Sequence, residues 1–327
     1  MLRVPVAGQD GGIGGRLNPV HPPITYFGGK SKLAAEIIAA FPHHRRYVEV
    51  CGGSLAVLLA KPQSHEEVVN DLDHRLQTFW RVLRDQPGEL ERVCTLTPHS
   101  RAERELAWEI TPDLPDLEVA RRVWIALTQG RAGSLTRTGW RHDTGSPRPP
   151  SMPVRLQRYA GRFAPAAARL SEVSLESRPA IEMVRAYGGD RTTLLYVDPP
   201  YDAERSRSYA VDMSRAEHRE LAEACRDADA AVVVSGYSGA VWDEVLSGWY
   251  RTEMRSYTTQ GSGAERGRVE VLWSNRDTSP ATPSRDETRS RCPACTAIIR
   301  QPATGRRRRW CSAACRQRGY RAGDGQT

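Results

Sequence analysis

The chain has 327 residues, a length that accommodates one large α/β domain and a small additional module. Of its 47 basic and 39 acidic residues, 12 arginines and 4 acids follow residue 275, which leaves 35 of each sign before it and places the whole net charge of +8 in the tail. We find no apolar run of transmembrane length and no basic segment followed by an apolar core at the start, so we expect neither a membrane partner nor a signal peptide.

The first recognisable element begins after a flexible leader. Residues 1–22 are rich in glycine and proline and are expected to be flexible. A helix is predicted over 33–41, and Gly28 and Gly29 precede Lys30 just before it. Glycines at a helix start let the backbone approach a ligand closely, although an ordinary glycine turn with solvated lysines is the alternative.

A strand, a glycine turn and a helix come next. The strand is predicted over 47–50 and the helix over 55–60, and the turn between them contains Gly52 and Gly53. This succession is the nucleotide-binding unit of doubly wound sheets.

A second short strand, predicted over 68–71, ends at an acid. Asp71 lies 19 residues after Gly52, about the interval at which doubly wound folds place a carboxylate on ribose hydroxyls. Capping of the following helix, predicted over 72–83, is the alternative role for Asp71.

A helical region separates these strands from the rest of the sheet. Helices are predicted over 89–94, 101–110, 117–130 and 154–170. The loop over 131–142 carries small hydroxyl residues, a tryptophan and the arginines Arg131, Arg137 and Arg141. These residue types suit contact with phosphates and base edges, so the loop is predicted to bind DNA; a solvated surface loop is the alternative.

The sheet then resumes with alternating strands and helices. Strands are predicted over 173–175, 193–197 and 231–235, helices over 180–187 and 214–226, and a closing antiparallel pair over 251–257 and 268–273. The pattern predicts an α/β fold with a Rossmann-like sheet.

The strand over 193–197 runs directly into Asp198-Pro199-Pro200-Tyr201. Ligand chemistry in such sheets gathers at the carboxyl ends of the strands, so Asp198 is predicted to face a site. Its carboxylate only accepts hydrogen bonds, and the prolines supply carbonyls without competing N–H groups, an arrangement suited to holding an exocyclic amine. Tyr201 offers a face for base stacking. A proline turn in which Asp198 is merely a cap is the alternative.

The tail has its own pattern. A polar linker is predicted over 276–291, followed by Cys292 and Cys295 and, after 15 further residues, Cys311 and Cys315. Two cysteine pairs at this spacing predict a structural zinc site in a module over 292–321. The module is basic, and Arg307 and Arg308 are predicted to contact DNA; a purely structural or protein-docking module is the alternative.

Taken together, residues 23–275 resemble the Dam-type (D12 class) N6-adenine-specific DNA methyltransferases, particularly phage-borne members. The resemblance rests on four motifs in the family's order: Tyr26-Phe27-Gly28-Gly29-Lys30, Glu49-Val50-Cys51-Gly52-Gly53, Asn70-Asp71-Leu72-Asp73 and Asp198-Pro199-Pro200-Tyr201. It implies an S-adenosylmethionine-dependent methyltransferase sheet with a helical target-recognition insert over 87–170. It also implies cofactor contacts by Tyr26, Lys30, Glu49, Gly52, Gly53, Asp71 and Asp198.

The expected reaction is methyl transfer to N6 of an adenine flipped out of DNA. Asp198, Pro199, Pro200 and Tyr201 are the predicted catalytic residues. Cys51 stands where the family usually has an aromatic residue, which keeps a catalytically inactive nucleic-acid-binding protein as an alternative. N4-cytosine methylation and an RNA substrate are the others. We expect a bacterial or phage-encoded protein of the cytoplasm, associated with the nucleoid; a partner restriction nuclease is left open.

Overall fold

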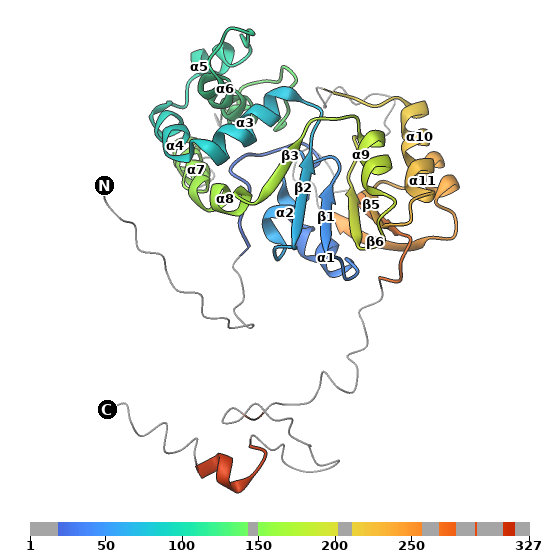
Figure 1. The fold of residues 1–327 in the computed structure, drawn as a ribbon. Coiled ribbons are helices and arrows are strands. Elements are labelled where there is room, and N and C mark those ends of the chain that lie inside the picture. The colour runs from blue at the N-terminus through green and yellow to red at the C-terminus, as the bar shows by residue number, and fades with distance from the viewer. Residues whose placement is uncertain are drawn as a thin grey trace. The chain divides into compact units, whose positions relative to one another are not determined.

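The computed structural model in Figure 1 describes residues 19–142, 150–201, 211–256, 268–278, 292 and 310–317. The chain divides into two compact units, Met1–Thr278 and Ser279–Thr327. Within the described residues, no helix has the length and apolar character needed to cross a lipid bilayer.

The first unit is built on a seven-stranded sheet. Its strands are β1 (Arg46–Glu49), β2 (Glu66–Asn70), β3 (Val173–Glu176), β4 (Thr193–Val197), β5 (Ala231–Gly236), β6 (Tyr250–Ser256) and β7 (Arg268–Ser274). They lie in the order β3-β2-β1-β4-β5-β7-β6, and β1 to β5 are parallel while β7 runs antiparallel to both β5 and β6. The order reverses between β1 and β4, which is where doubly wound sheets bind ligands.

The central strand β4 explains why the site lies where it does. All five of its residues are buried, as expected for a parallel strand covered on both faces. Leu194 and Tyr196 pack into one apolar cluster, whereas Leu195 and Val197 pack into another. The strand therefore separates two layers of core and delivers Asp198 to the carboxyl edge of the sheet.

Helices cover both faces (Figure 1). One face packs against α1 (Ala34–Ala39), α2 (Ala56–Ala60), α3 (His74–Asp85) and, beyond them, α4 (Pro87–Leu96), α6 (Asp116–Gln129), α7 (Met152–Ala160) and α8 (Phe163–Leu170). The other face packs against α9 (Ala180–Tyr187), α10 (Arg215–Arg226) and α11 (Ala240–Val245). The remaining helix, α5 (Arg101–Leu106), lies in the helical insert and contacts α6.

Most predicted elements are present, with shifted ends. The helix predicted over 154–170 is in fact two, because the chain turns at Gly161 and Arg162 between α7 and α8. Glycine favours such an interruption, and the turn seats Phe163 edge-on against Trp124, with ring centroids 6.2 Å apart. The helix predicted over 101–110 ends at Leu106, and α11 was not predicted.

Candidate active site

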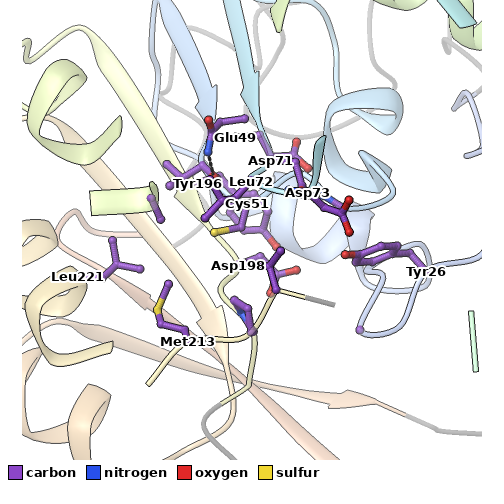
Figure 2. A pocket seen from close by; sticks show the side chains of 18 of the residues that line it. Tyr26, Glu49, Cys51, Asp71, Leu72, Asp73, Tyr196, Asp198, Met213 and Leu221 are labelled. Carbon is purple, nitrogen blue, oxygen red and sulfur yellow. Dashed lines mark hydrogen bonds between the residues drawn. The ribbon is translucent and has the colours of Figure 1, made fainter. Parts of the chain in front are cut away.

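A pocket of about 1170 Å³, a volume that includes open solvent at its mouth, lies at the carboxyl edge of β1, β2 and β4. All seven residues expected to contact the cofactor line it: Tyr26, Lys30, Glu49, Gly52, Gly53, Asp71 and Asp198. Pro200 lines it as well. Figure 2 shows Tyr26, Asp71 and Asp198 around this pocket, with Met213 and Leu221 as apolar side chains.

The glycine turn after β1 can be made only by glycine. A Cβ at Gly52 would lie 2.7 Å from Leu55 Cδ2 and 3.2 Å from the carbonyl oxygen of Asn70. Gly53 has φ +52°, in the left-handed region, and a Cβ there would lie 2.9 Å from the ring of Tyr26. The missing side chains let the backbone form the wall of the pocket.

Asp71 fixes this turn to the end of β2. Its carboxylate accepts hydrogen bonds from the backbone N–H groups of Gly53, at 2.8 Å, and Asp73, at 2.9 Å. Burial raises the pKa of Asp71 to about 6, although these two hydrogen bonds oppose the shift. The N-cap of α3 is Asp73, which accepts from the Arg75 N–H at 3.0 Å, so Asp71 is not the cap of that helix.

Glu49 lies deeper in the wall. Its Oε2 accepts hydrogen bonds from the Tyr47 hydroxyl at 2.8 Å and from the Leu58 backbone N–H at 3.0 Å. Burial raises the pKa of Glu49 to about 8 in spite of these bonds. Glu49 thus connects β1 to α2 directly behind the glycine turn.

Asp198 is held by two donors on the same oxygen. Oδ1 receives hydrogen bonds from Lys30 Nζ at 2.6 Å and from Ser235 Oγ at 2.8 Å. Burial alone would lower the pKa of Lys30, but the negative charge of Asp198 and that of its neighbours raise it well above its ordinary value, so the ammonium stays charged. Lys30 therefore contacts the carboxylate at the floor of the pocket.

Tyr201 turns away from the lining of the pocket and joins the same network. Its hydroxyl accepts from Lys30 at 3.0 Å, and its ring stacks on Tyr237 with centroids 4.1 Å apart and planes 19° apart. Ser235 and Tyr237 were missed from the sequence, although they end or follow an apolar strand just as Asp198 does. Pro199, between Asp198 and Pro200, is buried.

Residues 26–107 match the family model for D12 class N6 adenine-specific DNA methyltransferases. The matched stretch contains Tyr26, Lys30, the glycine turn and Asp71. This stretch, 82 of the 327 residues, is what the chain has in common with the family. A comparison with curated proteins found no match. The match to the family model supports methylation of N6 of adenine in DNA, and the N4-cytosine and inactive-protein alternatives are not favoured.

Arg131, Arg137 and Arg141, which were predicted to bind DNA, lie on a hairpin and are not among the residues that line the pocket. Gly130 and Trp140 form an antiparallel bridge, and backbone bonds join Arg131 to Gly139. Arg137 pairs with Glu105 at 2.6 Å while three quarters of its side chain stays exposed. Arg141 donates to the carbonyl of Arg131 at 3.2 Å. The three arginines therefore lie on one short loop that these backbone and side-chain contacts hold in place.

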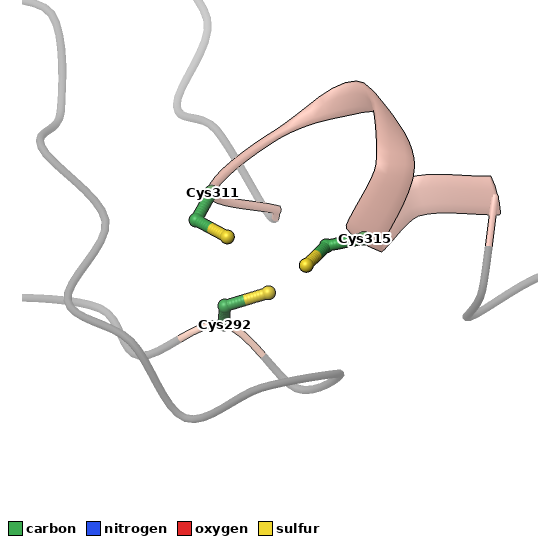
Figure 3. Close-up of side chains that lie close together, drawn as sticks. All are labelled: Cys292, Cys311 and Cys315. Carbon is green, nitrogen blue, oxygen red and sulfur yellow. The ribbon is translucent and has the colours of Figure 1, made fainter.

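Three of the four predicted metal ligands lie together in the second unit. The sulfur atoms of Cys292, Cys311 and Cys315 are within 4.8 Å of one another (Figure 3). Ser312 Oγ accepts from the Cys315 N–H at 3.2 Å and so caps the short helix over 313–317. Cys295, Arg307 and Arg308 lie outside the described residues. A group of three thiols suits a soft cation such as zinc.

Proposed function

We propose that Asp198 and the carbonyl of Pro199 accept the two N–H bonds of the target adenine amine during methyl transfer. The observation that carries this is the one-sided hydrogen bonding of Asp198 at the floor of the pocket. Among the described residues, Oδ1 receives both Lys30 and Ser235, so Oδ2 is the oxygen directed to an incoming donor. Hydrogen bonds to both N–H groups would release the nitrogen lone pair from conjugation with the ring. The lone pair could then be directed at the electrophilic methyl group.

S-adenosylmethionine is the methyl donor implied by the family, and it would supply the methyl group as a sulfonium. The polar and apolar groups that line the pocket suit such a molecule in chemistry. Asp71 would accept the ribose hydroxyls, the glycine turn would admit the cofactor close to the backbone, and Leu221 and Met213 would cover its apolar parts. Tyr26 and Glu49 complete this wall, and Asp198 lies where the donor and the amine would meet.

We assign Tyr201 to the flipped base. Its hydroxyl is fixed by Lys30, and its ring already stacks on Tyr237, so the pair offers a rigid aromatic surface beside Asp198. Unstacking a base costs a few kcal/mol, which such stacking would offset in part. Pro200 keeps the connection between Asp198 and Tyr201 stiff.

DNA recognition is proposed for two other parts of the chain. Within the methyltransferase domain over 23–275, the insert over 87–170 would place Arg131, Arg137 and Arg141 on the DNA. After the linker over 276–291, the module over 292–321 would hold zinc through Cys292, Cys295, Cys311 and Cys315 and add basic contacts through Arg307 and Arg308. The positive charge of this tail supports a polyanionic partner.

The test is Asp198→Ala, assayed with labelled S-adenosylmethionine and plasmid DNA. Loss of the amine acceptor should lower the single-turnover rate by about a thousandfold or more, while the melting temperature stays near that of the wild type. Asp227→Ala, which removes an exposed carboxylate at the end of α10, is the matched control and should keep full activity. A folded Asp198→Ala variant with near-normal methyl transfer would refute the assignment.

A further inference from the structure

A second carboxylate is buried beside the proposed reaction centre. Glu270, on β7, is 1% exposed. Its Oε1 lies 3.2 Å from Lys30 Nζ, and its Oε2 accepts from the Tyr201 hydroxyl at 3.3 Å. Burying a carboxylate is costly unless it is paired and hydrogen-bonded, and both partners of Glu270 are groups that also hold or adjoin Asp198.

The geometry around Lys30 makes the two carboxylates compete. Its ammonium has three N–H bonds but four acceptors: Gly28 O at 3.0 Å, Asp198 Oδ1 at 2.6 Å, the Tyr201 hydroxyl at 3.0 Å and Glu270 Oε1 at 3.2 Å. One cation is thus shared by two anions. The cluster of Lys30, Asp198 and Glu270 carries a net negative charge when all three are ionised.

We propose that Glu270 is a positioning residue for methyl transfer. Glu270 and Asp198 share the Lys30 ammonium, so Lys30 does not neutralise the negative charge of Asp198. The proposal rests on the role assigned to Asp198 above. Without Glu270, Lys30 would form a closed ion pair with Asp198, and the carboxylate would hold the amine less strongly. With Glu270 present, the cluster stays anionic while positive charge develops on the amine nitrogen. A preorganised negative charge at this place would stabilise the transition state.

The surroundings of Glu270 fix the sign of its pH dependence. The charged and titratable groups that act on Glu270 are Lys30, Asp198 and Tyr201. Its cross-strand neighbour on β6 is the uncharged Met254. Burial and Asp198 raise the pKa of Glu270, while Lys30 opposes them. Protonation of Glu270 should therefore begin at a higher pH than for an ordinary glutamate, and the rate should fall as the pH drops through that range.

Glu270→Gln in the full-length protein tests this, because the amide keeps the shape and the acceptor for Tyr201 but removes the charge. At neutral pH the single-turnover rate should fall about tenfold or more, with the dissociation constants for S-adenosylmethionine and DNA changed less than about twofold. The ratio of wild-type to variant rates should shrink toward one as the pH is lowered, because protonated Glu270 and Gln are equivalent in charge. Glu253→Gln on β6, whose side chain is 56% exposed, is the matched control.

Two results would overturn the proposal: a wild-type rate for a folded Glu270→Gln variant, or a loss of rate by the same factor at every pH. If Gln at this position prevents folding, Glu270→Asp replaces it, because the shorter side chain draws the carboxylate away from Lys30 and should slow transfer several-fold; a wild-type rate would then be decisive. Asp198→Ala run in parallel separates the two ideas. Activity in the Asp198→Ala variant would contradict the proposed role of Asp198. An inactive Asp198→Ala variant together with a fully active Glu270→Gln variant would contradict only the role of Glu270.

Discussion

The shape of the glycine turn depends on the absence of a Cβ atom, and a substitution at Gly53 tests this. Gly53→Ala would place a methyl group 2.9 Å from the Tyr26 ring in a backbone conformation that disfavours side chains. We expect destabilisation by more than about 1 kcal/mol and weaker binding of S-adenosylmethionine, measured by thermal melting and calorimetry. Gly88→Ala, in α4, meets no atom within 4 Å and should leave the cofactor affinity unchanged. Equal cofactor binding by both variants would contradict this account of the turn.

Glu270, which was also missed from the sequence, differs from Asp71 and Asp198 in its position along a strand. Asp71 and Asp198 each follow an apolar strand of the parallel set, where the pattern of the sequence points to a ligand site. Glu270 stands instead near the beginning of β7. Because β7 is antiparallel to β5, its early residues reach the same edge of the sheet, and only the strand pairing reveals that.

Lys30 illustrates a different limit of sequence reasoning. The family resemblance of its motif predicted that Lys30 contacts the cofactor, and Lys30 does line the pocket. Its partners, however, come from 168 and 171 residues further along the chain and from β7. No local pattern encodes such contacts, so the charge cluster could not be predicted.

At the level of elements, buried apolar runs were the most predictable parts. The bounds of β4 and α9 match those expected, because apolar content and glycine or proline boundaries coincide there. The interruption between α7 and α8 was not predicted, because the apolar periodicity continues across Gly161, whereas Phe163 packs against Trp124 and Phe79 from other parts of the chain.

The hairpin over 130–142 carries the next prediction. Replacing Arg137 and Arg141 together with alanine should weaken DNA binding and lower the slope of log affinity against log salt by about one for every phosphate that these arginines neutralise. Fluorescence anisotropy over a range of salt concentrations measures this. Arg191→Ala removes an arginine whose side chain is 82% exposed, before β4, and should leave the slope unchanged. A double variant with the wild-type slope would show that the hairpin does not touch phosphates.

At the scale of the whole molecule, the positive charge is concentrated in the tail that contains the cysteine cluster. The residues before 276 are balanced, and the excess arginines accompany the cysteine cluster. If the cluster holds zinc, Cys311→Ser together with Cys315→Ser should abolish bound zinc, measured by atomic emission, and weaken DNA binding while leaving cofactor affinity intact.

Cys225→Ala is the matched control for this experiment, because that thiol belongs to α10 and is buried in the apolar cluster of the first unit. It should retain the metal. Full zinc content in the Cys311 and Cys315 variant would argue against a metal centre at this place.

The insert over 87–170 leaves the sheet after α3 and returns at β3, an edge strand that among the described residues pairs only with β2. An insert in this position can be lengthened, shortened or replaced without any change in the order of the interior strands. If the insert reads DNA as proposed, a new DNA preference is therefore within evolutionary reach while the central strands stay as they are.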